Sequence, residues 1–459
     1  MGTLGVWGDA VEKYGGRRRL FSTVGQLLSL ALPLAAGMLF QVAFNLVDAY
    51  FIGRLGTDAF AAVNLASFSV WLLSGLVGIV GTGANARVAQ CLGGGRMDRV
   101  VRLRGQAIRA SLAVGVLTSL IGLLGAEPLT LYLSGREEES RLAAVLTAQY
   151  LSIIFLAAPL LCFNETMSAL FRGTGDTRTP TKILSLGFVV NAVLDPLLIF
   201  GFGPIPGLGV VGAALASILS FLFSSLLFAL VGREWFRKRE EPVRWALDEV
   251  PGMISVGLPP SITNIVFCVV YMGVTPHIAS MGTEALAALG LGHKVISLSY
   301  FLCLSFSLAA ITLTGQSTGA EDKEEALYRS WVVVGVATFT NALVGSGLVY
   351  FSPAICSLFS DDPVVLSMAA AYLKIVVPSQ VLLGIGMSVE GAFAGFGKTT
   401  SPMVISVISS VARWPAVAWV VASGHFGIHG VWWVFALSTY FRGLALFFLL
   451  FGARNENRS

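Results

Sequence analysis

Long apolar runs dominate the sequence and most constrain what this chain can fold into. The first, residues 27–52, is 26 residues long and carries one acidic residue, Asp48, near its end. About 20 apolar residues in a helix cross a bilayer. Only 12% of all residues are charged and 55% are hydrophobic, whereas soluble domains are about 25% charged. We therefore predict an all-α polytopic membrane protein.

The spans are expected to be helices, because the apolar runs do not alternate polar and apolar residues as barrel strands do. About twelve such transmembrane helices are expected. The expected helices cover residues 25–52, 59–90, 101–125, 142–171, 181–203, 207–231, 252–278, 284–316, 327–352, 364–394, 402–423 and 429–452. The five cysteines are scattered through these runs and show neither metal-binding spacing nor a disulfide framework. No resident metal or cofactor is expected.

The basic residues predict the orientation, since cytoplasmic loops carry an excess of Lys and Arg. If both termini are cytoplasmic, 23 of the 30 Lys and Arg residues fall on the cytoplasmic side. Three fall on the other side: Arg54, Arg136 and Arg141. Four lie within helices: Lys294, Lys374, Arg413 and Arg442. Basic loops beside a membrane need no nucleic acid, so we expect no nucleic-acid partner.

The chain repeats itself. The sequence GTDAFAA at 56–62 returns as GTEALAA at 282–288, and at this offset of 226 residues Pro33 matches Pro259. Residues 148–180 align without gaps on residues 370–402, with 11 of 33 positions identical. Six spans per half give two parallel repeats, as in transporters whose halves form lobes around a central cleft.

This repeat predicts five segments. Residues 1–24 form a cytoplasmic tail, 25–231 an N-terminal lobe of six helices, and 232–250 a charged cytoplasmic linker. Residues 251–452 form a C-terminal lobe of six helices, and 453–459 a second cytoplasmic tail. A cleft between two lobes can open to either side of the membrane in turn.

Charged residues that occur in one half only are candidates for function, because features that both halves share follow from the repeated architecture. Asp48 matches Val274, so the second half has no carboxylate there. Gln41 and Asn45 lie seven and three residues before Asp48, which places all three on one helix face. Such a polar stripe is expected to face water or another helix and not lipid. The alternative is that Asp48 lies at the membrane interface.

A second acid of this kind is Asp195 in the fifth run, with Asn191 one turn before it. Pro196 lacks an N–H and leaves the carbonyl of Ala192 without its helical partner. A carboxylate, an amide oxygen and a free carbonyl suit a small hard cation. The second half has Arg413 and Val417 at the positions of Asn191 and Asp195. The alternative is an acid pair satisfied by hydrogen bonds alone.

Other charges within helices have a structural interpretation. Glu165 in the fourth run can pair with Arg172, which is seven residues away. Charged residues within the helices of the second lobe include Lys294, Lys374, Glu390 and Arg413. We expect these four residues to form ion pairs with one another. The pair His425 and His429 lies in a glycine-interrupted external loop, so we expect no metal site there. No P-loop, nucleophile elbow or HExxH motif is present, so an enzyme or an ATP-driven pump is not expected.

The sequence resembles the multidrug and toxic compound extrusion (MATE) transporters. The resemblance rests on Pro33 followed by Asp48, the segment FIGRLGTDAFAAVNLA, the loop RGTGDTRTP with its repeat FGKTTSP, and NAVLDPLLIF at the end of the fifth run. It covers nearly the whole chain. It implies a multi-pass protein of the plasma membrane, in which a cation gradient drives export of organic and often cationic compounds.

The resemblance also implies residue roles. Asp48, Asn191 and Asp195 match the ion-coupling residues of the DinF-like branch, and Ser217 is the nearest match to a helix-6 hydroxyl. Other branches use acids in helix 7 and helix 10, where this chain has Phe267 and Leu383. The resemblance therefore points to the DinF-like branch.

The mechanism predicted from these residues is antiport of an organic solute against H⁺ or Na⁺. Binding of the ion at Asp48 and Asp195 neutralises them, and the first helix then repacks around a hinge at Pro33. Two adjacent carboxylates favour holding a proton, because like charges repel. The expected cleft lining is Gln41, Asn45, Asn64, Trp71, Phe155 and Met387. Two fused halves already supply both lobes, so we expect a monomer.

Two alternatives remain at this point. A lipid-linked oligosaccharide flippase of the related superfamily would use a cationic cleft, for which Lys294, Lys374, Arg413 and Arg442 are the available charges. A membrane enzyme or receptor would need a catalytic constellation or a soluble domain. The longest polar linker, about 19 residues, offers neither.

Overall fold

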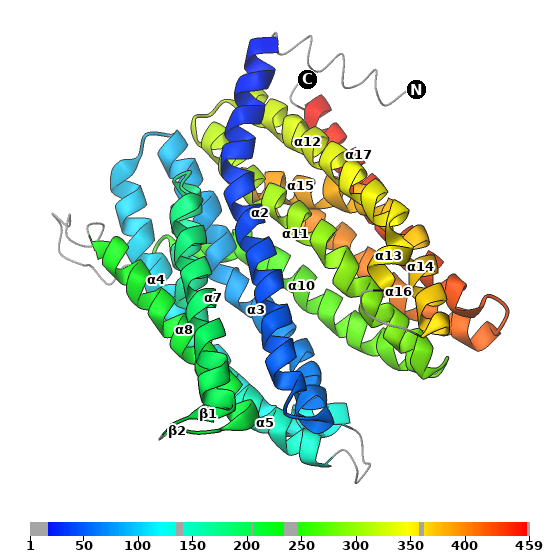
Figure 1. Ribbon diagram of the computed structural model, residues 1–459. Coiled ribbons are helices and arrows are strands. Elements are labelled where there is room, and N and C mark those ends of the chain that lie inside the picture. Colours follow the sequence, from blue (N-terminus) through cyan, green and yellow to red (C-terminus); the bar gives the residue numbers. More distant parts are fainter. Residues whose placement is uncertain (1–16, 135–140, 204, 234–246, 358–361, 457–459) are drawn as a thin grey trace. The chain divides into compact units, whose positions relative to one another are not determined.

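The computed structural model describes residues 17–134, 141–203, 205–233, 247–357 and 362–456, and these are almost entirely helical (Figure 1). The helices are α2 (Arg17–Gly53), α3 (Thr57–Gly93), α4 (Met97–Ser134), α5 (Arg141–Leu156), α6 (Ala158–Gly173), α7 (Arg178–Ile199), α8 (Gly209–Val231), α10 (Val250–Ala279), α11 (Thr283–Gly319), α12 (Lys323–Tyr350), α13 (Ser352–Cys356), α14 (Pro363–Val376), α15 (Gln380–Phe396), α16 (Thr400–Ser423) and α17 (Gly427–Glu456). Among the described residues, 11 helices are long and apolar enough to span a membrane, or 12 if α5 and α6 form one bent span. The predicted all-α membrane fold of about twelve spans is confirmed.

The fourth and tenth spans are interrupted, whereas the sequence predicted continuous helices over 142–171 and 364–394. α5 and α6 meet at an angle of 49°. Pro159 is at the start of α6, where its missing N–H breaks the hydrogen-bond ladder. In the tenth span a 3₁₀ turn, Val377–Ser379, which contains Pro378, separates α14 from α15. Proline therefore breaks both spans near equivalent positions of the repeat.

Three helix ends differ from the bounds expected from the sequence. Residues 17–24, assigned to the N-terminal tail, are the start of α2, and α17 continues to Glu456, inside the predicted C-terminal tail. The fifth helix ends at Ile199 and not at 203. It is followed by an antiparallel pair of two-residue strands, β1 (Gly201–Phe202) and β2 (Ile205–Pro206). Gly201 and Gly203 allow this turn because their φ angles are 83° and 59°, a region that other residues rarely adopt.

The chain divides into two compact units that differ from the two predicted lobes in their bounds. Unit 1 comprises residues 1–35, 89–95 and 262–459, and unit 2 comprises residues 36–88 and 96–261. α2 changes unit after Ala35 and α10 after Ser261, positions that are 226 residues apart like the repeat itself. Pro33 lies two residues before the first change, and Pro259 two residues before the second. Each of these helices therefore carries a proline where it passes from one unit to the other.

A reciprocal contact inside unit 1 shows the repeat in three dimensions. A Cβ atom on Gly93 would overlap the backbone carbonyl of Gln316, and one on Gly319 would overlap the carbonyl of Gln90. Gly93 matches Gly319 and Gln90 matches Gln316 in the alignment of the halves. Repeat-related segments of α3 and α11 therefore approach each other so closely that both positions require glycine.

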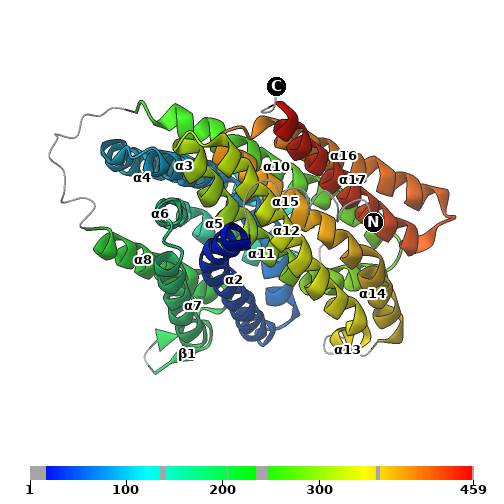
Figure 2. The same ribbon diagram turned by 90° about the horizontal axis from the view of Figure 1, so that it is seen from above.

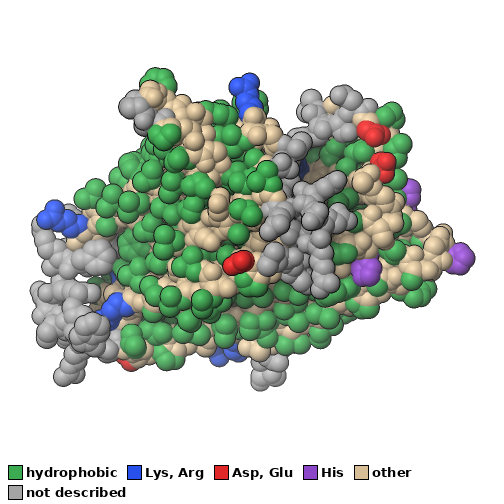
Figure 3. All heavy atoms as spheres, turned by 90° about the horizontal axis from the view of Figure 1, so that it is seen from below, with side chains coloured by type: hydrophobic (Ala, Val, Ile, Leu, Met, Phe, Trp, Pro, Cys, Tyr) green, Lys and Arg blue, Asp and Glu red, His purple; other side chains and the backbone are tan. Residues whose placement is uncertain are grey.

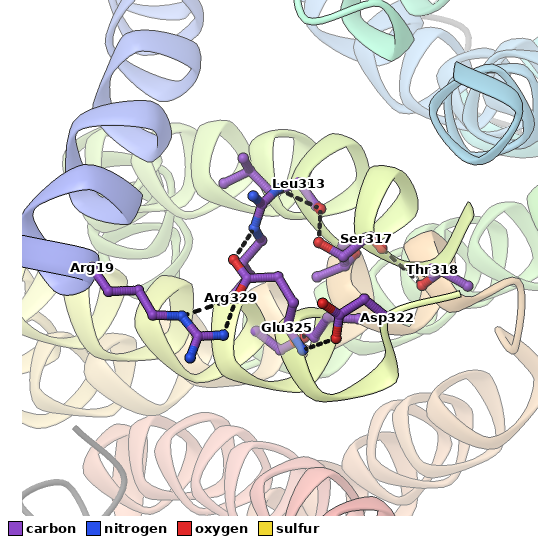
Figure 4. A network of polar contacts seen from close by, with 10 residues as sticks. Arg19, Leu313, Ser317, Thr318, Asp322, Glu325 and Arg329 are labelled. Atoms are coloured by element: carbon purple, nitrogen blue, oxygen red, sulfur yellow. Dashed lines mark hydrogen bonds and ion pairs between the residues drawn. The ribbon is translucent and has the colours of Figure 1, made fainter. Parts of the chain in front are cut away.

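A polar network holds the start of α2 on the other helices of unit 1 (Figure 4). Nε of Arg19 donates to Glu325 of α12 at 3.1 Å, and Glu325 also accepts a 2.7 Å bond from Nε of Arg329. Arg329 reaches the carbonyl of Leu313 on α11 at 3.5 Å. Asp322 caps α12 by accepting from the backbone N–H of Glu325 at 2.8 Å. The network therefore joins three helices at one end of unit 1.

A matching anchor holds the start of α10 in unit 2. The carboxylate of Glu249, which is nearly fully buried, forms a bidentate ion pair with Arg99 of α4. Gln106, about two helix turns further along α4, donates to Asp248 at 2.7 Å and accepts from the backbone N–H of Glu249 at 2.9 Å. The Gln106 hydrogen bond and the nearby arginines Arg102 and Arg99 hold the pKa of Asp248 below its usual range. These contacts fix the described end of the linker to the first half of the chain.

The outer surface is apolar in the way a bilayer requires. Large side chains such as Leu124 and Phe339 are 81% and 72% exposed. Hydrophobic side chains dominate the face drawn in Figure 3, and charged ones are few on it. A soluble protein rarely exposes so much contiguous apolar surface. The surface therefore agrees with the helix lengths in placing the chain in a membrane.

Candidate functional site

Asp48, Asn191 and Asp195 come together in unit 2. Asp195 is fully buried on α7, and its Oδ1 accepts a 2.9 Å hydrogen bond from Nδ2 of Asn191, one turn earlier. Asp48, half-buried on α2, brings its carboxyl group within hydrogen-bond reach of the Asp195 carboxyl group. The rings of Phe44 on α2 and Phe188 on α7 stack at 5.5 Å and hold the two helices together. The two acids that distinguish the first half of the sequence therefore face each other.

The second oxygen of Asp195 is the unsatisfied group of this cluster. Its Oδ2 is buried and has no hydrogen-bond partner among the described residues. Leaving a buried acceptor unpaired costs about 1–3 kcal/mol, and more if it is charged. A proton shared by the two carboxyl groups, or a small cation bound between them, would remove this cost. Pro196 adds an acceptor, since it leaves the carbonyl of Ala192 without its helical donor.

Tyr150 lies near the cluster, and sequence reasoning missed it. Its ring is buried on α5, and its phenol lies within electrostatic range of both Asp48 and Asp195. The internal repeat hides this residue, because Tyr372 occupies the matching position in the second half. A search for differences between repeats finds only groups that one half lacks.

The other residues predicted beside the ion site are less closely placed. Ser217 is half-buried on α8, and its carbonyl accepts from Ser220 at 2.8 Å, but no contact of its hydroxyl with the acids is seen in the described part of unit 2. Gln41 is half-buried and Asn45 exposed on α2. Of the polar face predicted on α2, Asp48 reaches the α7 acid, and no hydrogen bond from Gln41 or Asn45 to that acid is seen in the described part of unit 2. The coupling role of Ser217 stays a prediction.

The expected cleft-lining residues differ widely in exposure. Trp71 is 45% exposed, whereas Phe155 belongs to the hydrophobic core of unit 2 and packs on Gly122 of α4. Met387 is buried in unit 1. The side chain of Asn64 lies outside the described residues. Packing accounts for Phe155, and lining of a cleft stays a prediction for the set.

Two glutamates within spans belong to structural ion pairs. Glu165 accepts from Arg172 at 2.6 Å, and Arg172 also donates to Ser168 at 2.7 Å, so the predicted Glu165–Arg172 pair is confirmed. Glu390 accepts two bonds from NH2 of Arg442 on α17, at 2.7 and 2.8 Å. Ser168 and Glu390 occupy matching positions of the repeat. The fourth span of each half therefore carries a glutamate that pairs with an arginine, on the same helix in the first half and on α17 in the second.

The expected ion pairs among Lys294, Lys374, Glu390 and Arg413 are wrong. Glu390 pairs with Arg442, and both lysine side chains are exposed. Arg413 lies on α16 and donates from Nε to Ser438 of α17 at 3.0 Å. The error arose because pairing depends on which helices pack together, and helix order along the chain does not show that.

The comparisons with known proteins agree with this architecture. A family model described as MatE matches residues 33–197 and 259–419, two segments that begin 226 residues apart. The probable multidrug resistance protein NorM of Thermotoga maritima is 29% identical over 93% of this chain and 92% of its own length. A protein named FAD transporter, from Shewanella oneidensis, is 27% identical over 92% and 93%. The multidrug export protein MepA of Staphylococcus aureus is 24% identical over 94% of both chains.

Solved structures show the same fold. A multidrug resistance MATE family transporter of the MOP superfamily in an outward-facing conformation superposes with a TM-score of 0.85, at 22% identity over 95% of this chain and 96% of that one. A MOP superfamily transporter from Pyrococcus furiosus gives the same TM-score at 22% identity, over 93% and 94%. At this level of identity the structures establish the arrangement of helices and leave the transported solute open.

Proposed function

Because this chain belongs to the MatE family, whose model matches each of its halves, we propose that it is a secondary active multidrug efflux transporter. It exports organic compounds, often cationic and amphiphilic, in exchange for H⁺ or Na⁺, and it acts as a transporter and not as an enzyme. Relatives named as multidrug resistance or multidrug export proteins, aligned over at least 92% of both chains, support this proposal.

The observation that carries the proposal is the cluster of Asp48, Asn191 and Asp195, in which Asn191 and Asp195 are buried. An ionisable residue inside a membrane is costly and is kept where it binds an ion or a solute. The orphaned Oδ2 of Asp195 requires a proton or a cation, and the half-buried Asp48 gives that ion a way in. Among the described residues of unit 1, the matching positions hold Val274, Arg413 and Val417, so coupling is assigned to the first half of the chain.

The proposed coupling step is a change of charge at the contact between α2 and α7. Without a bound ion, the carboxylates of Asp48 and Asp195 repel each other. When a proton or Na⁺ binds, the repulsion ends and α2 can pack against α7. Pro33 lies two residues before the point where α2 changes from unit 1 to unit 2, so repacking can bend the helix there. Alternating access would then follow from this bend and its counterpart near Pro259 of α10.

The finer assignments are also part of the proposal. Two features favour the DinF-like branch. The first half carries Asp48 and Asp195, and the chain has Phe267 and Leu383 at the positions where other branches have acids. The excess of Lys and Arg in the loops that follow even-numbered spans favours cytoplasmic termini in a plasma membrane. The chain is proposed to act as a monomer.

The flippase alternative is not favoured. A pyrophosphate-binding cleft needs several uncompensated cations, but Glu390 neutralises Arg442, and Lys294 and Lys374 are exposed on their helices. Arg413 remains as one cation in the interior of unit 1. A single arginine suits a small anionic group better than a lipid pyrophosphate.

The test is efflux of a fluorescent cationic dye from proteoliposomes with an imposed ion gradient. We expect Asp48→Asn and Asp195→Asn each to lower the rate at least about tenfold, since Asn cannot exchange a proton and weakens cation binding. The matched control is Asp98→Asn, the same change at an exposed position on α4. Wild-type rates in both cluster variants would refute the coupling proposal.

The same vesicles identify the ion. One set carries a pH gradient without Na⁺, and the other carries a Na⁺ gradient at equal pH. If only one of the two gradients drives dye export, the ion of that gradient is the coupling ion. If neither gradient drives dye export, the antiport proposal is wrong.

A further inference from the structure

The interior of unit 1 holds an arginine at the position where unit 2 holds its ion site. Arg413 of α16 matches Asn191 in the repeat. α16 and α17 run side by side (Figure 2), and Nε of Arg413 donates to Oγ of Ser438 at 3.0 Å. Ser438 itself donates to the carbonyl of Phe435 at 2.9 Å, so its hydroxyl is left to accept from Arg413. This chain of hydrogen bonds fixes the direction of the guanidinium.

The charge of Arg413 is uncompensated within the described part of the chain. Its hydrogen bonding there is the single Nε bond to Ser438, and its terminal nitrogens NH1 and NH2 keep no protein acceptor. Glu390 is occupied by Arg442 and by the hydroxyl of Ser406. A guanidinium does not lose its proton in a protein, and a lone charge in a membrane is costly. The two free nitrogens have the spacing that a carboxylate or phosphate oxygen pair accepts.

Aromatic rings surround this cation. The guanidinium carbon lies 5.3 Å from the ring centre of Phe435 and 5.9 Å from that of Phe267. Tyr271 stacks between these two rings, with centroids 6.4 and 6.0 Å away. Its phenol makes a 2.6 Å hydrogen bond with Nε2 of His293 on α11. Phe435 and Tyr271 are almost fully buried, so the guanidinium faces the inside of unit 1 and not lipid.

We propose that Arg413, with Phe267, Tyr271 and Phe435, forms a subsite for the carboxylate or phosphate of a planar aromatic solute. The oxyanion would bind NH1 and NH2 of Arg413 bidentately, and the ring system would lie against the aromatic side chains. The substrate range then includes anionic and zwitterionic aromatic compounds beside cations. This inference rests on the proposed function only in taking the chain to be a transporter of organic solutes.

The experiment uses two dyes that share a xanthene ring system and differ in charge. Carboxyfluorescein is anionic and rhodamine 123 is cationic, and fluorescence anisotropy reports the binding of each to the purified full chain in phosphatidylcholine nanodiscs. We expect Arg413→Gln to weaken binding of carboxyfluorescein about 10- to 100-fold, the range for lost charge-assisted hydrogen bonds. Binding of rhodamine 123 is expected to change less than about threefold. Lys374→Gln, which removes an exposed charge in the same unit, is expected to leave both affinities unchanged.

Further variants keep the test decisive. Ser438→Ala removes only the acceptor that positions Arg413, so a severalfold loss of carboxyfluorescein binding is expected. Arg413→Lys keeps the charge but not the paired nitrogens, so it also tests the subsite if Arg413→Gln does not fold. Carboxyfluorescein affinities equal to wild type in all three variants, or no binding to the wild type, would overturn the subsite.

Lipid competition and dye export distinguish a solute subsite from a lipid site. If phosphatidylglycerol in the nanodiscs displaces carboxyfluorescein and vesicles do not export it, the site holds a lipid headgroup and the solute proposal is wrong. If rhodamine 123 is exported while carboxyfluorescein does not bind, the subsite fails and the proposed function stands. If carboxyfluorescein binds through Arg413 while no dye is exported under either gradient, the proposed function fails and the subsite stands.

Discussion

Replacing Glu390 by Gln would break the ion pair with Arg442 while keeping the size of the side chain. Glu390 accepts two bonds from Arg442 and one from Ser406. The Arg442 and Glu390 side chains are 18% and 23% exposed, so this ion pair is intermediate between an exposed pair and a fully buried one. Breaking an exposed pair costs at most about 1 kcal/mol and breaking a buried one about 3–5 kcal/mol. We expect Glu390→Gln to lower the free energy of unfolding by about 2–3 kcal/mol.

Scanning fluorimetry of the purified protein measures this effect. In a chain of this length each kcal/mol moves the Tm by about 2 °C or less, so a fall of about 3–6 °C is expected. The double variant Glu390→Gln/Arg442→Gln removes both charges and is expected to recover part of the loss, because no charge is then left alone. Glu324→Gln, at an exposed position of the same unit, is the control and should change the Tm by less than about 1 °C.

Transport provides the second half of this prediction. If the Glu390–Arg442 pair is structural, Glu390→Gln will export dye at the wild-type rate at temperatures where it is folded. An unchanged Tm together with lost ion coupling would refute the reasoning, since it would make Glu390 a coupling acid of the second half. Strictly additive effects of the two single changes would also contradict it, because residues in contact are expected to couple.

Three shorter predictions test the packing of the helices. Glu325→Gln is expected to release Arg19 and raise the amide exchange rate of residues 17–25, and unchanged exchange would show that the network in Figure 4 does not hold α2. Gly93→Ala and Gly319→Ala are each expected to cost about 1–3 kcal/mol by overpacking, and thermal unfolding should give similar values for both; tolerance of either would contradict the reciprocal contact. Pro33→Ala restores a helical hydrogen bond and is expected to slow dye efflux without changing ion binding, whereas an unchanged rate would exclude a hinge there.

The sequence predicted the number of spans, the internal repeat and the placement of Asn191 beside Asp195. These predictions succeeded because apolar length, helical spacing and repeat alignment are local or directly countable properties. The spacing of Asn191 and Asp195 places them one turn apart on any helix, and the structure joins them at 2.9 Å. The prediction of the Glu165–Arg172 ion pair succeeded for the same reason, since both residues lie on one helix.

Features that depend on contacts between helices were not predictable in this way. The partner of Glu390 lies on α17, 52 residues away, and several other cations were equally plausible from the sequence. Tyr150 was hidden because both halves carry tyrosine at that position. The breaks near Pro159 and Pro378 were missed because apolar composition continues across them. The division of α2 between two units likewise depends on packing that no local pattern records.

The most direct test of the central claim counts the ions that substrate displaces from the first-half cluster. Rhodamine 123 is added to purified protein in a weakly buffered solution, and released H⁺ and Na⁺ are measured together. Wild type is expected to release about one ion per bound dye, and Asp48→Asn and Asp195→Asn are expected to bind dye with little or no release. Equal release from wild type and both variants, or dye binding to wild type that releases neither ion, would contradict the assignment of coupling to Asp48 and Asp195.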